Sequence, residues 1–204
     1  MITRWGYEID SDFYPCALLD TNDFNTLTGG KYTDFDRITA EIDAASDRIR
    51  DYVGWHLFPS CDCVLNVAVT DRRITTVRHD LLVQLPARYV TAVKEVTVCG
   101  VESNDYSLDP NGLLVLYDAH PGSRRDRIVV KYTAGLPPEM MRGIQELVAH
   151  RVTHALAVPA GITSEASGGV SVTYNAGWVN NSNATALLDN NKELLIPYMV
   201  EGVF

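Results

Sequence analysis

Residues 34–69 read DFDRITAEIDAASDRIRDYVGWHLFPSCDCVLNVAV, and the spacing of their apolar residues changes partway along this stretch. In its first twenty residues, apolar side chains return every three or four positions, as they do on one face of a helix. From Cys61 to Val69 they occupy every second position, as they do in a strand with one buried face. Gly54 lies between the two patterns and suits the left-handed end of a helix. The stretch therefore predicts an α+β fold.

The helix predicted over residues 34–53 has two different faces. We expect Thr33 to cap its first turn together with Asp36. The expected buried face consists of Phe35, Ile38, Ile42, Ala45, Ile49 and Tyr52. The opposite face is mostly acidic and consists of Asp36, Arg37, Glu41, Asp43, Asp47, Arg48 and Asp51. This face is either a solvated surface or a functional acidic one.

Residues 61–133 are predicted to form a module of short antiparallel strands. The sequence Asp109-Pro110-Asn111-Gly112 has the residue types of a tight turn, and apolar runs flank it on both sides. Further strand patterns occur at 81–85, 90–98 and 128–133. Short strands at regular spacing favour a small antiparallel β-barrel or a sandwich-like module.

Helical patterns return after Gly135. Pro137 and Pro138 suit a helix start, and apolar residues then recur at helical spacing as far as residue 157. A shorter helix is expected at 184–195, and a short strand before it at 171–174. We therefore expect a helical core, with helices near 34–53, 138–157 and 184–195, that carries an inserted β module. The expected segments are an N-terminal arm with the first helix (1–60), the β module (61–133), and the remaining helices with a C-terminal arm (134–204).

Composition excludes several classes of protein. The 204 residues are 46% apolar and 21% charged, which is a globular balance rather than a disordered one. The net charge of −9 argues against a protein whose main task is to grip nucleic acid. No apolar run reaches the ~18 residues that a membrane span requires. The first eight residues lack a basic region followed by an apolar one, so we expect no signal peptide and synthesis in the cytoplasm.

Motifs of known catalytic chemistry are missing from the sequence. It contains neither a G-x-S-x-G nor an H-E-x-x-H pattern. His150 and His154 are spaced to share a metal ion on a helix, but a structural role is favoured. Cys61 and Cys63 form a C-x-C pattern without a second pair, and we interpret them as small core residues rather than a zinc site or a disulfide. We therefore expect no enzyme and no catalytic, cofactor or metal residues.

The C-terminal sequence LLIPYMVEGVF is almost entirely apolar, although chain ends are normally polar. It either packs on the protein's own core or docks on another subunit. The residues expected to dock are Leu194, Leu195, Ile196, Tyr198, Met199, Val200, Val203 and Phe204.

Five stretches in this order resemble the head–tail connector proteins of long-tailed bacteriophages, also called adaptors or head-completion proteins. Residues 23–32 and 45–60 are similar to the start of the family's pattern and to the end of its first helix with a Gly-Trp-His turn. Residues 85–100 resemble its first strand pair, and 130–138 its return to helix. Residues 164–174 are similar to the loop after the second helix.

The resemblance implies a structural virion protein of the neck. Such a protein forms a homo-oligomeric ring, commonly of twelve copies, beneath the portal protein. The ring extends the DNA channel and is the platform for the next neck or tail protein. The family's C-terminal segment commonly reaches into the portal. If DNA passes without specific binding, an acidic channel wall is favourable, and the expected lining residues are Asp36, Glu41, Asp43 and Asp47.

Two other functions fit the sequence less well. The first alternative is a different neck or tail-completion protein, which has the same kind of role in another layer of the assembly. A β module that binds carbohydrate or peptide is the second alternative. Clustered aromatic residues on that module would favour it, but Trp5, Trp55 and Trp178 all lie outside residues 61–133.

Overall fold

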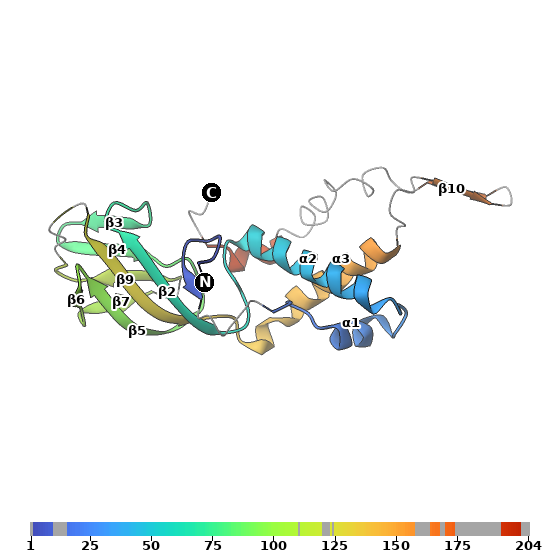
Figure 1. The fold of residues 1–204 in the computed structure, drawn as a ribbon, viewed down its shortest axis with the longest axis horizontal. Helices are drawn as coiled ribbons and strands as arrows, with labels where there is room; N and C mark the ends of the chain where they lie inside the picture. The colour runs from blue at the N-terminus through green and yellow to red at the C-terminus, as the bar shows by residue number, and fades with distance from the viewer. Residues whose placement is uncertain are drawn as a thin grey trace. The chain divides into compact units, whose positions relative to one another are not determined.

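The computed structural model (Figure 1) describes residues 2–9, 16–109, 111–119, 123, 125–157, 164–167, 170–173 and 193–200. The chain divides into two compact units, and each is described by itself. The first, here called the β unit, contains Met1–Cys16, Arg50–Met140 and Tyr198–Phe204. The second, here called the helical unit, contains Ala17–Ile49 and Met141–Pro197.

The larger sheet of the β unit has five antiparallel strands. Their order is β1 (Glu8–Ile9), β2 (Cys61–Ala68), β9 (Arg127–Ala134), β5 (Val90–Val98) and β6 (Val101–Glu102). The longest regular pairing joins β2 to β9, from Cys61 opposite Ala134 to Ala68 opposite Arg127. Strands that are distant in sequence therefore lie side by side at the centre of this sheet.

The smaller sheet has four antiparallel strands in the order β3 (Ile74–Val77), β4 (Asp80–Gln84), β8 (Leu113–Leu116) and β7 (Tyr106–Leu108). The turn predicted at 109–112 joins β7 to β8. The Asp109 side chain accepts a hydrogen bond of 2.7 Å from the backbone of Asn111, and the Gly112 N–H donates one of 2.9 Å to the Asp109 carbonyl. Gly112 has a φ of 83°. A side chain there would come within 2.4 Å of the Ala87 carbonyl oxygen, so glycine is required.

Alternate side chains of both sheets form the core of the β unit. The buried residues are Cys63, Leu65 and Val67 on β2; Ile128, Val130 and Tyr132 on β9; Leu81 and Val83 on β4; and Leu114 and Leu116 on β8. Each sheet begins and ends with a different edge strand, so neither closes on itself within the described part of the chain. The α+β prediction is confirmed, whereas the closed barrel, one of the two architectures expected for 61–133, is wrong.

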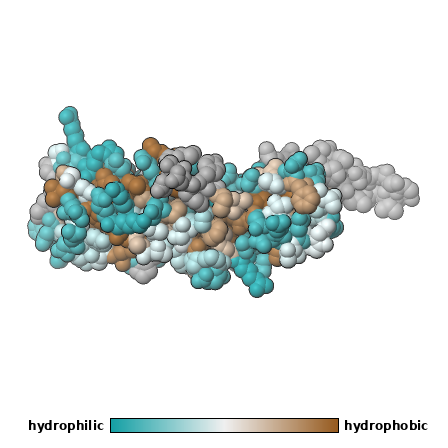
Figure 2. All heavy atoms as spheres, turned by 60° about the horizontal axis from the view of Figure 1, so that its bottom comes forward, coloured by the Kyte–Doolittle hydropathy of each residue, from teal (hydrophilic) through white to brown (hydrophobic). Residues whose placement is uncertain are grey.

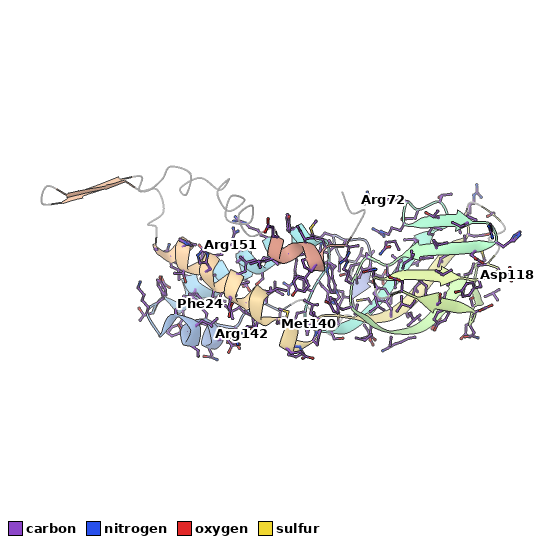
Figure 3. All side chains as sticks on the ribbon, turned by 180° about the vertical axis from the view of Figure 1, so that it is seen from behind. Phe24, Arg72, Asp118, Met140, Arg142 and Arg151 are labelled. Carbon is purple, nitrogen blue, oxygen red and sulfur yellow. The ribbon has the colours of Figure 1, made fainter. Side chains whose placement is uncertain are left out.

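The helical unit contains helix α1 (Thr21–Thr28), most of α2 (Phe35–Val53) and α3 (Arg142–Ala157). It also contains the paired strands β10 (Ser164–Ser167) and β11 (Val170–Thr173). The sequence analysis did not predict α1, although it has clear ends. Its Asp20 cap accepts a 2.7 Å hydrogen bond from the Asp23 backbone, and Gly29 closes it in a left-handed conformation. Phe24 is its buried side chain (Figure 3).

Helix α2 follows its prediction except in its first turn. Ile38, Ile42, Ala45 and Ile49 are buried, and Gly54 ends the helix with a φ of 83°. The helix begins at Phe35, and the Asp34 carboxylate accepts the hydrogen bond from the Arg37 backbone. Asp34 is therefore the cap rather than Thr33. Phe35 precedes the buried stretch and is 57% exposed, so its expected place on the buried face is wrong.

The second predicted helix is confirmed with a different start, and most of the third lies outside the described residues. Pro138–Met140 forms a single 3-10 turn, η1, and α3 begins at Arg142. Of the helix expected at 184–195, the structure describes residues 193–195, which are helical and lead into a second 3-10 turn, η3 (Ile196–Tyr198). None of the described helices has the length and apolar character needed to cross a membrane.

Candidate docking surface, acidic helix face and cysteine cluster

The described part of the apolar C-terminal segment, residues 193–200, contains both exposed and buried side chains. Leu194 and Ile196 are 59% and 55% exposed. Leu195 is buried between them, and Val200 is also buried. Tyr198 and Met199 are half-buried. The predicted docking residues therefore divide into an exposed pair and others that the protein itself covers, while Val203 and Phe204 lie outside the described residues.

Two hydrogen bonds hold the end of this segment on the β unit. The indole nitrogen of Trp55, which is completely buried, donates a bond of 2.7 Å to the Tyr198 carbonyl oxygen. The Val200 N–H donates a bond of 3.0 Å to the carbonyl oxygen of Val53. The donors and acceptors of both bonds belong to the β unit, so residues 198–200 have a defined place in that unit.

The acidic residues of α2 do not all lie on one stripe. A helix turns by about 100° per residue, which puts Asp36, Asp43 and Asp47 within about 40° of one another. All three are exposed. Glu41 is half-buried and lies about 140° around the helix from Asp36. The structure therefore brings three of the four predicted channel residues together on the side away from Ile42, and it separates Glu41 from them.

Two hydrogen bonds between side chains and the backbone stabilise the helical unit. Arg37 donates a hydrogen bond of 3.0 Å to the carbonyl oxygen of Ala155, in the last turn of α3, where carbonyls lack helical partners. The buried Ser46 hydroxyl accepts a bond of 3.0 Å from the Leu18 N–H. These bonds fix α2, which carries the three exposed aspartates, within the helical unit. Figure 3 shows Arg142 and Arg151 on α3 of the same unit.

His150 and His154 of α3 contact each other as their spacing predicts. Their Nε2 atoms are 3.2 Å apart. Burial, and after it the neighbouring His150, lowers the pKa of His154.

A cluster that the sequence analysis did not predict lies in the β unit and consists of His56, Cys61 and Cys63. All three are buried, and one ligand atom of each lies within 4.8 Å of the others. The hydrogen bond from Cys63 and, after it, the contact with His56 lower the pKa of the Cys61 thiol to about 5, against the effect of burial. The same hydrogen bond and burial raise the pKa of the Cys63 thiol. The spacing H-x4-C-x-C was the available signal, but only the fold shows that the loop returns His56 to the strand.

The surface is otherwise mixed. On the face seen in Figure 2, hydrophilic side chains surround smaller hydrophobic areas. The helices and antiparallel sheets define an α+β protein.

A comparison with known protein families identifies the family to which this protein belongs. The model of the head completion protein family matches residues 17–189, so the chain belongs to this family of bacteriophage connector proteins. The predicted resemblance is confirmed, and membership assigns the chain to the structural proteins of the phage head–tail connection. No curated protein matches the chain.

Proposed function

We propose that this protein is a head–tail adaptor, which forms a ring of identical copies beneath the portal of a long-tailed phage. The ring extends the DNA channel and provides the platform for the next neck or tail protein. The match to the head completion family over most of the chain carries this proposal. A ring requires heterologous contacts that close by rotation, and twelve copies are the number that the resemblance implies.

The exposed pair Leu194 and Ile196 is the proposed portal-docking surface. Burying one such side chain contributes about 1.5–3 kcal/mol, so two in each copy favour attachment substantially. In a ring, the copies would bind together, which strengthens attachment further. Leu195 and Val200 are buried in the protein itself and would support the pair rather than contact the portal. Met199, Val203 and Phe204 complete the proposed segment.

The exposed aspartates of α2 are the proposed channel-facing surface. Asp36, Asp43 and Asp47 would repel the phosphate backbone and leave few counterions to release, so passing DNA would not be retained. The net charge of −9 in each copy adds to this effect.

Replacing the exposed pair tests docking without damage to the core. The variant Leu194→Ser/Ile196→Ser should bind purified portal at least tenfold more weakly and should fail to attach to heads. A matched control replaces two other exposed aliphatic residues, Leu27→Ser/Val101→Ser, at 52% and 70% exposure. This control should bind normally, and circular dichroism should show that both variants fold.

Equal portal binding by the docking variant and the wild type would contradict the docking assignment. Binding of the wild-type protein to isolated tail tubes, but not to portal, would instead favour a neck or tail-completion protein of another layer. Sedimentation of the protein with and without portal then measures whether it forms a ring and how many copies the ring contains.

A further inference from the structure

The cysteine cluster (His56, Cys61 and Cys63) brings three strong metal ligands together inside the β unit. Cys61 and Cys63 occupy alternate positions of β2 and therefore point to the same face of the sheet. His56 comes from the loop between α2 and β2 and is completely buried. Cys61 is 8% exposed, whereas Cys63 is 1% exposed, so Cys61 is the member closest to solvent.

The distances within the cluster match those between ligands of one zinc ion. The two sulfur atoms are 3.8 Å apart, and Nε2 of His56 is 3.2 Å from the Cys61 sulfur. In a tetrahedral site, Zn–S bonds of about 2.3 Å separate two sulfurs by about 3.8 Å, and a Zn–N bond of about 2.0–2.1 Å puts nitrogen about 3.5 Å from sulfur. A small movement of the imidazole is therefore sufficient to complete the geometry.

We propose that His56, Cys61 and Cys63 bind a Zn²⁺ ion. Thiolate and imidazole are the ligands that zinc prefers, and three protein ligands leave a fourth position for water. Binding releases the thiol protons of both cysteines to solvent and adds no oxidant or reductant.

A second observation points to the same place. The hydroxyl of Tyr132 is completely buried and has no hydrogen-bond partner among the described residues. Buried hydroxyls normally have one. Tyr132 lies directly opposite Cys63 in the pairing of β2 with β9, so the two side chains point to the same face of the sheet. A zinc-bound thiolate or water would provide the missing partner.

Tyr7 contacts the second nitrogen of the His56 ring, the one that the proposed zinc ion would not use. Its hydroxyl is 2.7 Å from Nδ1 of His56 and accepts a bond of 3.1 Å from the His56 N–H. In the structure, the 2.9 Å contact between Nε2 and the Ala134 carbonyl assigns the ring proton to Nε2. Zinc binding moves this proton to Nδ1, which then donates to the Tyr7 oxygen. A polar partner on the second nitrogen is the usual support of a metal-binding histidine.

A disulfide fits this cluster less well than a metal ion. Positions two apart on a strand have Cα atoms about 6.6 Å apart, near the upper limit for disulfides, which prefer about 5.5–6 Å. Cys61 and Cys63 are both paired with β9, so shortening their separation would distort the central strand pair. A zinc ion joins the two sulfurs at the distance they already have.

The metal content of the purified protein tests the proposal. Full-length protein, produced in zinc-supplemented medium and purified without chelators, should contain one zinc per chain by mass spectrometry. After removal of zinc, added Co²⁺ should give the sulfur-to-metal charge-transfer absorption of thiolate ligands. Chelation should lower the midpoint of thermal unfolding, because an ion that binds only the folded state stabilises it.

Matched variants distinguish this site from accidental binding. Cys61→Ala and Cys63→Ala should each lose the zinc and the cobalt absorption. The control Cys16→Ser/Cys99→Ser changes two exposed cysteines and should retain both. Wild-type protein without zinc and without cobalt absorption would overturn the proposal, whether or not the alanine variants fold. A mass two hydrogen atoms lighter in the wild type and also in the Cys16→Ser/Cys99→Ser control, which indicates a Cys61–Cys63 disulfide, would also overturn it.

Discussion

The indole nitrogen of Trp55 donates a hydrogen bond of 2.7 Å to the carbonyl oxygen of Tyr198, a residue 143 positions later in the chain. Trp55 directly follows Gly54, the end of α2, and directly precedes His56 of the cysteine cluster. The place of the C-terminal segment on the β unit therefore depends on the short loop that also carries the proposed zinc ligand.

Replacing Trp55 by Phe should release residues 198–200. Phe retains much of the buried ring but cannot donate a hydrogen bond, so the Tyr198 carbonyl loses its partner. The free energy of unfolding should fall by about 1–3 kcal/mol. Hydrogen exchange should become faster at Val200, whose N–H bonds to Val53. The control Trp5→Phe changes a half-buried tryptophan and should leave this exchange unchanged. Unchanged protection of Val200 in the Trp55 variant would show that the hydrogen bond is not needed.

Replacing Gly135 by Ala should destabilise the β unit. A Cβ atom at this position would lie 2.3 Å from Cα and 2.5 Å from the nitrogen of Ser60, which are backbone atoms that cannot rotate away. We expect a loss of about 1–3 kcal/mol in urea denaturation. Gly143→Ala, on α3, is the matched control because nothing lies within 4 Å of the added atom. It should raise stability by about 0.5–1 kcal/mol through helix propensity. Equal stability of the two variants would refute the steric argument.

Reversing the charge of the acidic stripe should make assembled particles retain DNA. The variant Asp36→Lys/Asp43→Lys/Asp47→Lys replaces a repulsive surface by one that releases counterions on binding phosphate. We expect slower DNA ejection, and salt-dependent binding of DNA by isolated rings.

A control with the same charge change separates position from net charge. It carries Glu102→Lys, Asp105→Lys and Glu139→Lys, three exposed positions of the β unit. Each replacement adds two positive charges, so both variants carry −3 instead of −9. Equal retention by the two variants would show that the aspartates of α2 do not face the channel.

Replacing His150 by Gln should raise the pKa of His154. Burial and, after it, His150 lower that pKa in the folded protein, whereas the unfolded chain has the ordinary value. The unfolded state then binds more protons near pH ~6, so the free energy of unfolding falls as the pH is lowered through this range. The variant should weaken this dependence. NMR titration of His154 measures the shift, and His79→Gln, at an exposed position, is the control. A pKa of His154 that is equal in both variants would contradict the effect of His150.

The parts of the fold that could be predicted have a strong repeat in the sequence. Helix α2 and strand β2 bury a complete face, so their apolar residues follow the period of the element. Helix α1 buries Phe24 as its one core residue, and its eight residues TNDFNTLT show no such repeat. Strand β3 is largely exposed, so it too has no buried face to reveal it. Phe35 fits the repeat of α2 but lies in the first turn, beyond the buried surface.

The candidate sites could be predicted only in part, because the sequence shows composition and periodicity but not tertiary packing. Composition identified the apolar C-terminal segment and the acidic helix face, but tertiary packing decides which of their residues are exposed. Tertiary packing buries Leu195 and leaves Ile196 exposed. The cysteine cluster depends on a loop that brings His56 next to β2. It also depends on the pairing of β2 with β9, which puts Tyr132 opposite Cys63. Neither relationship has a periodic signal in the sequence.

Both edge strands of the five-stranded sheet, β1 and β6, are two residues long. Short edge strands are one device by which natural proteins limit polymerisation through their sheets. In the ring proposed above, brief edge strands would favour recognition between copies through side chains, which yields a closed assembly rather than a fibre.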